Sequence, residues 1–204
     1  MPGFPDATAL RACIARYWTP GIGDPEFTGW LTVASYLVCL VLAVRVLMRR
    51  PPGAARWLWV AIALLTAFLA VNKQLDLQSA LTAAGRCMAM AQGWSEHRRI
   101  VQFGFIVMLV LAVLLALVIG FRRLRGRLRH NGLALLGLAI LCGFVLVRAV
   151  GFHHVDHLIG MQFGRFRFNF LFENTGLVMI AANALFLLWR GRSPRRAGVR
   201  PSRS

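Results

Sequence analysis

Five apolar stretches alternate with polar segments along the chain. They begin near Gly29, Trp57, Ile100, Leu133 and Thr175. A helix needs about 20 residues to cross the hydrocarbon core of a bilayer, because it rises about 1.5 Å per residue. Three stretches are long enough, namely Gly29–Met48, Ile100–Phe121 and Leu133–Phe152. The pattern predicts an all-α, polytopic membrane protein with five transmembrane helices.

The second and fifth stretches, Trp57–Val71 and Thr175–Trp189, are too short to cross unaided. The second must continue about five residues further, and the fifth must begin several residues earlier. These extensions carry polar residues to membrane depth: Asn72, Lys73, Asp76, Glu173 and Asn174. At helical rise, Lys73 and Glu173 both lie about 25 Å from the inner boundary, and Arg148 lies at nearly the same height. We therefore expect a polar layer in the outer leaflet.

The second helix is expected to continue past Asp76 as an amphipathic extension. At about 100° per residue, Asn72, Asp76 and Ser79 fall on one stripe, opposite the apolar side chains of Leu81 and Met88. Such a segment rises out of the bilayer or lies along its outer surface.

The remaining segments flank a single transmembrane domain over residues 29–189. An outer N-terminal segment covers 1–28, where Asp6 can cap a short interfacial helix. The alternating segment Phe163–Phe172 predicts a short extended stretch. Residues 190–204 are rich in Arg, Ser, Pro and Gly and predict a disordered basic cytoplasmic tail.

Arginines are concentrated in the first loop, the third loop and the tail, which lie on one side if there are five crossings. The positive-inside rule then places the N-terminus outside and the C-terminus in the cytoplasm. A net charge of +17 can indicate a nucleic-acid partner. Here the arginines lie beside apolar runs and act as topology signals, so we expect no nucleic-acid partner. The expected partner is the lipid bilayer, including its anionic headgroups.

The polar layer has two interpretations. Intramembrane charges usually face the bundle interior and pair with one another. Lys73, Arg148, Asp76 and Glu173 could form structural ion pairs that hold three helices in register. Together with Asn72, Ser79 and Asn174, they could instead form a site for a substrate that enters from outside.

A histidine cluster extends the second interpretation. His153 and His157 are four residues apart and share a face of a helix, a spacing at which two imidazoles can bind one metal ion. His97, at the outer end of the third stretch, could supply a third nitrogen. A zinc-like ion held there would lower the pKa of a bound water, with Asp76 as general base and Lys73 or Arg148 stabilising the developing anion.

Cysteines and methionines leave two further alternatives open. Cys87, Met88, Met90 and the histidines are soft or borderline ligands that could also suit haem or copper. Cys13 and Cys87 are both expected outside, in an oxidising compartment, where they could form a disulfide.

A Ser/Asp pair on an early helix and an HxxxH pair on a late one resemble the CREST-type membrane hydrolases, which are seven-span zinc enzymes. The matching residues are Ser79, Asp76, His153 and His157; the span count differs, and the expected histidine near the serine is missing. The whole set of motifs also resembles an uncharacterised family of bacterial inner-membrane proteins. The resemblance implies a location in the cell inner membrane.

Two functions follow from these observations. The first is an inner-membrane protein with an outward-facing polar and histidine site that binds a lipid-like substrate or hydrolyses it with metal assistance. The second is a non-catalytic accessory subunit, whose buried charges assemble it with itself or with a partner protein.

Overall fold

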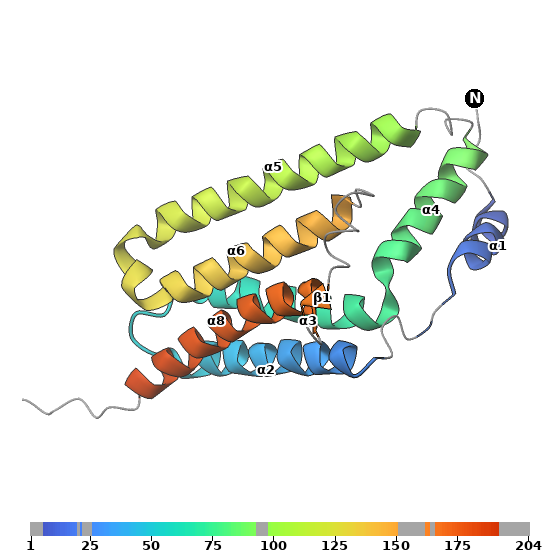
Figure 1. Cartoon of the computed structure of the whole chain (residues 1–204). Helices are drawn as coiled ribbons and strands as arrows, with labels where there is room; N and C mark the ends of the chain where they lie inside the picture. The colour runs from blue at the N-terminus through green and yellow to red at the C-terminus, as the bar shows by residue number, and fades with distance from the viewer. Residues whose placement is uncertain are drawn as a thin grey trace, which may run out of the picture.

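The computed structural model describes residues 6–19, 21, 26–92, 98–150, 162–163 and 166–191. Its elements, in chain order, are α1 (Ala7–Tyr17), α2 (Phe27–Arg49), α3 (Arg56–Leu75), α4 (Leu77–Ala91), α5 (Arg98–Leu124), the 3₁₀ turn η2 (Arg125–Arg127), α6 (Leu128–Val150), β1 (Gln162–Phe163), β2 (Phe166–Arg167) and α8 (Phe168–Arg190) (Figure 1). The two-residue strands β1 and β2 pair in antiparallel fashion. All other elements are helical, so the expected all-α class is confirmed.

Four helical segments are long and apolar enough to cross a membrane: Phe27–Arg49, Arg56–Leu75, Phe103–Val147 and Phe170–Arg190. The third segment contains both α5 and α6, which fold back on each other at η2 (Figure 1). The chain thus has the helices of a multi-pass membrane protein.

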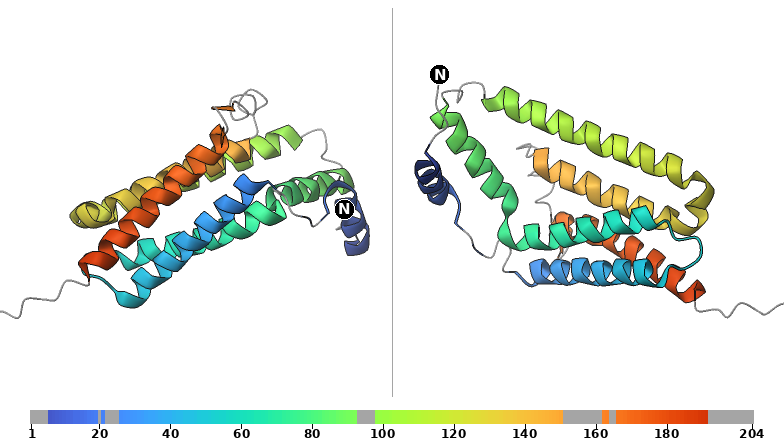
Figure 2. Two further views of the ribbon diagram at one scale, coloured as in Figure 1. Left: turned by 60° about the horizontal axis from the view of Figure 1, so that its bottom comes forward. Right: turned by 180° about the vertical axis from the view of Figure 1, so that it is seen from behind.

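Helices α2, α3, α6 and α8 form the bundle, and α5 packs beside α6 at its edge (Figures 1 and 2). The bundle core contains fully buried side chains from each of the four helices, such as Tyr36, Trp59, Leu141 and Ile180. Apolar side chains on the outside remain exposed along every one of these helices. This distribution suits helices surrounded by lipid, because lipid tails are as apolar as a protein core.

Helices α6 and α8 approach most closely where two glycines face each other. A Cβ atom added to Gly137 would lie 2.6 Å from the carbonyl oxygen of Gly176, and one added to Gly176 would lie 2.8 Å from the carbonyl oxygen of Gly137. Small residues allow this backbone contact, which is a common basis of helix association in membranes.

Two buried asparagines join the helices near the end where α8 finishes. Asn131 on α6 accepts hydrogen bonds from the Ala55 amide and the Trp59 indole, and donates to the carbonyl of Gly53. Asn183 on α8 accepts from the Ala134 amide and donates to the His130 carbonyl, which are groups that an ideal α-helix pairs with each other. Each amide therefore connects separate parts of the chain without leaving a buried polar group unsatisfied.

The second helix does not run on past Asp76, so the expected continuous extension is wrong. Helix α3 ends at Leu75, and Asp76 adopts a left-handed conformation with φ 45° and ψ 52°. The chain then turns into α4, a separate helix that leads away from the bundle (Figure 1). The segment is helical as expected, but a non-glycine residue at positive φ breaks it from α3.

Other local expectations compare more favourably. Asp6 caps α1, accepting hydrogen bonds from the backbone and hydroxyl of Thr8, as predicted. These bonds lower the pKa of the Asp6 carboxyl.

The helix of the fifth stretch begins earlier, at Phe168, as the length of that stretch required. Among the described residues of the alternating segment, those in β1 and β2 are extended, whereas the chain is helical from Phe168 onwards.

Candidate functional site

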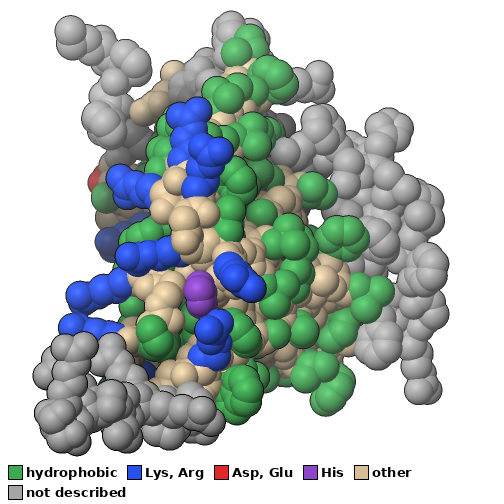
Figure 3. All heavy atoms as spheres, turned by 90° about the vertical axis from the view of Figure 1, so that its left-hand side faces the viewer, with side chains coloured by type: hydrophobic (Ala, Val, Ile, Leu, Met, Phe, Trp, Pro, Cys, Tyr) green, Lys and Arg blue, Asp and Glu red, His purple; other side chains and the backbone are tan. Residues whose placement is uncertain are grey.

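Charged side chains divide the described bundle into two ends. At the arginine end, α2 finishes with Arg49, α3 begins with Arg56, η2 covers Arg125–Arg127 and α8 finishes with Arg190. Figure 3 looks onto this end and shows Lys and Arg side chains spread across it. The opposite end, called the carboxylate end here, contains the described acidic residues Asp6, Glu26, Asp76 and Glu173.

The centre of the carboxylate end is a buried ion pair between two helices. Lys73 Nζ on α3 lies 3.2 Å from Glu173 Oε2 on α8, and the side chains of Lys73 and Glu173 are only 8% and 4% exposed. The phenol of Tyr36, on α2, donates to Glu173 Oε1 over 2.7 Å. Both carboxylate oxygens therefore have a donor, and three helices meet at one carboxylate. We call Tyr36, Lys73 and Glu173 the ion-pair cluster.

A second polar contact joins α2 and α8 beside this cluster. The Asn174 amide donates to the Thr32 hydroxyl over 3.2 Å and to the Phe170 carbonyl over 2.9 Å. The Thr32 hydroxyl in turn donates to the Thr28 carbonyl. Asn174, which directly follows Glu173 in α8, therefore connects α8 to α2.

Asp76, the expected general base, occupies the corner between α3 and α4. Its backbone bonds to Asn72 and Ser79, the other two polar residues expected there. Its carboxylate has no hydrogen bond or ion pair within the described ranges, and Lys73 pairs with Glu173 instead. The Ser79 side chain is exposed, and Asn72 is half-buried. The structure thus brings Asn72, Asp76 and Ser79 together at the turn that directly follows Lys73.

Sequence reasoning missed three polar side chains at this end. Tyr36 and Thr32 lie within an apolar helix, where a buried polar group needs a hydrogen-bond partner. Their presence in this helix could therefore have indicated a polar contact with a neighbouring helix. The amide of Gln74 is buried and has no partner among the described residues, at oxygen or nitrogen.

The expected metal ligands His97, His153 and His157 lie outside the described residues. Arg148 belongs to α6, but its side chain is also outside the described set. In the sequence, His97 directly precedes α5, and His153 follows the last residue of α6 by three positions. Within the described part of the chain, no group of three His, Cys, Asp or Glu residues could hold a metal ion.

A disulfide joins the two helices outside the bundle. Cys13 on α1 is bonded to Cys87 on α4, with the Cα atoms 6.0 Å apart, so the disulfide anticipated from the sequence is present. The Arg86 guanidinium lies over the Tyr17 ring at 5.0 Å and adds a cation–π contact between the same helices. Together these contacts hold the N-terminal helix at the carboxylate end.

The comparisons with known proteins add no family. No family model matches the chain, and neither a curated protein nor a solved structure matches it. The proposed function therefore rests on the fold and on the geometry of the site.

Proposed function

We propose that the protein crosses the bacterial inner membrane five times, with the carboxylate end outside and the arginine end in the cytoplasm. Three features support this orientation. Helices α1 and α8 place the two ends of the described chain at opposite ends of the bundle (Figure 1). Arginines concentrate on one side, as cytoplasmic loops require. The Cys13–Cys87 disulfide belongs in an oxidising compartment, which the periplasm provides.

We infer that the outer end binds a lipid-like substrate and hydrolyses it with the help of a zinc-like ion. This proposal rests mainly on the polar groups at the carboxylate end, which are the ion-pair cluster and the Asp76 carboxylate. The histidines are close in sequence to the start of α5 and the end of α6. His97, His153 and His157 would hold the ion. Asp76, which has no partner in the described ranges, is available as a base.

In this arrangement Arg148 is the better candidate to stabilise a developing anion. Lys73 is already held by Glu173 at 3.2 Å, so moving it to a substrate would strand a buried carboxylate. We assign Lys73 the role of fixing α3 against α8, which positions the neighbouring corner at Asp76.

Metal content tests the proposal. The full-length protein, purified without chelator, is expected to retain about one equivalent of a divalent ion, and His153→Ala/His157→Ala is expected to lose it. The matched control is His130→Ala, because His130 lies at the arginine end beside Arg190. A wild-type protein without bound metal, or equal retention by the variant, would rule out metal-assisted hydrolysis.

A second function is that of a non-catalytic accessory subunit. It is favoured because the charged groups of the ion-pair cluster bond to one another inside the protein. Glu173 uses both oxygens within the protein, and neither it nor Lys73 is open to solvent. A cluster of this kind holds three helices in register. Under this proposal the cluster stabilises a surface that assembles with a partner or with another copy.

A further inference from the structure

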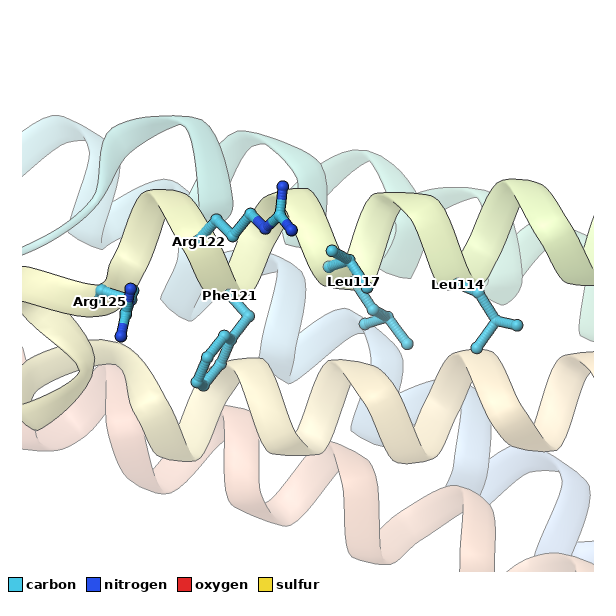
Figure 4. A pocket seen from close by; sticks show the side chains of 6 residues that line it. Leu114, Leu117, Phe121, Arg122 and Arg125 are labelled. Carbon is cyan, nitrogen blue, oxygen red and sulfur yellow. The ribbon is translucent and has the colours of Figure 1, made fainter.

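The flank of α5 carries an apolar groove that ends in arginines. Its lining is Leu114, Leu117, Val118, Phe121, Arg122 and Arg125, and its volume is about 370 Å³. This volume falls in the range of roughly 300–1,000 Å³ that small-molecule sites occupy. Figure 4 shows Leu114, Leu117 and Phe121 along the helix, with Arg125 at one end of this row and the Arg122 side chain turned to the other side of the helix from the Phe121 ring. We call these six residues the α5 groove.

The groove has the dimensions of a lipid chain and lies away from the rest of the bundle. From Leu114 to Arg125 the helix rises about 16 Å, which is close to half the thickness of the hydrocarbon core. Leu114, Val118 and Phe121 are each about half exposed, so a large part of each side chain is left uncovered by the described helices. By contrast, Gly120 on another side of α5 lies against Trp57 and Leu135 of the bundle.

Among the described residues, the arginines of the groove have no acidic partner. The chain has seven Asp and Glu residues, and none falls between residues 97 and 155, the region that includes all of α5, η2 and α6. Among the described residues, every carboxylate lies at the opposite end of the bundle. No described carboxylate therefore balances the positive charge of Arg122 and Arg125.

We propose that the α5 groove binds an anionic phospholipid of the leaflet at the arginine end. One acyl chain lies along Leu114, Leu117, Val118 and Phe121, and the headgroup phosphate accepts hydrogen bonds from Arg122 and Arg125. Arginine suits this role because its planar fork can bind phosphate oxygens in pairs. The proposal depends on membrane location and not on the catalytic proposal, and its test measures lipid retention instead of turnover.

Native mass spectrometry of the full-length protein in detergent tests the site. The probes are palmitoyl-oleoyl phosphatidylglycerol, phosphatidylcholine with the same chains, and glycerol phosphate without chains. We expect retention of phosphatidylglycerol alone. A charge-assisted hydrogen bond to the phosphate contributes about ten-fold in affinity, so Arg122→Gln/Arg125→Gln should weaken retention roughly 100-fold. Val118→Trp, which fills the apolar part and leaves both arginines, should also displace the lipid.

The matched control removes two arginines that lie outside the groove. Arg123 and Arg129 are exposed residues from the same end, and Arg123→Gln/Arg129→Gln makes the same change in net charge. Retention should fall less than five-fold in this control. Equal losses in both double variants would overturn the specific site in favour of a diffuse basic surface. Equal retention of both phospholipids, or binding unaffected by Val118→Trp, would also overturn it. A dimer that Val118→Trp dissociates would assign the groove to a second copy instead.

Discussion

At the residue scale, Glu173 determines how the carboxylate end is held together. It accepts from Tyr36 on α2 and pairs with Lys73 on α3, so one side chain of α8 connects three helices. A buried ion pair is weak evidence for net stability, because desolvation offsets much of the attraction. Breaking the pair from one side is nevertheless costly. The two proposed functions make different predictions for its removal.

The test is a double-mutant cycle on this pair. Lys73→Met and Glu173→Gln are each expected to lower the free energy of unfolding by about 3–5 kcal/mol, because each leaves a buried charge without its partner. The double variant should recover at least half of the summed loss. The measurement is chemical unfolding in detergent, with a cellular phenotype scored in parallel. Tyr36→Phe is the control, because it removes one hydrogen bond and keeps both charges.

The cycle has two informative outcomes for function. A double variant that folds and functions fully would show that the pair is structural and is not needed to position Asp76 for function. A double variant that folds well but has no function would support a working site at this end. Strictly additive losses would contradict the coupling of Lys73 with Glu173.

At the element scale, the contact of α6 with α8 depends on the absence of side chains at Gly137 and Gly176. A methyl group at Gly137 would approach the Gly176 carbonyl at 2.6 Å, a distance that requires the helices to separate. Separation would also disturb the Asn183 amide, which bonds to the backbone of α6 at Ala134 and His130.

We expect Gly137→Ala to destabilise the protein by about 1–3 kcal/mol, the usual cost of overpacking. Gly143→Ala is the matched control in the same helix, because a Cβ atom there has nothing within 4 Å. That control should be neutral or stabilising by up to about 1 kcal/mol, since alanine favours helix over glycine. Thermal unfolding of both variants in one detergent decides the comparison. Equal stabilities would show that the close approach does not limit packing.

The sequence predicted helix lengths better than helix directions. A helix long enough to cross the hydrocarbon core had to begin before Glu173, and α8 begins at Phe168. The same argument extended the second helix through Asp76, whereas α3 ends at Leu75; the turn at Asp76 was not predicted because neither Gly nor Pro marks it. The shared height of Lys73 and Glu173 followed from helical rise. Their pairing, in preference to Asp76, depends on how α3 packs in three dimensions, which spacing along the chain does not encode.

At the scale of the whole molecule, charge separates along the bundle. Described carboxylates lie at one end, and the arginines of η2 and of the ends of α2 and α8 lie at the other. We therefore expect a reporter that works only in the cytoplasm to be active when fused after Arg125 or Ser204, and inactive near Gly93 or Gly160. Activity near Gly93 would reverse the orientation and move the polar site inside. Comparable protein levels of all four fusions, measured by immunoblot, are the control.

The disulfide between α1 and α4 also changes the connectivity of the chain. Cys13 precedes α2 and Cys87 follows α3, so the bond closes a covalent ring across a sequence separation of 74 residues, and the ring runs through α2 and α3. The loop between these helices, at Pro51–Ala55, is the far point of that ring. A single nick in this loop would therefore release no fragment, and the two pieces would remain one covalent molecule until the disulfide was reduced.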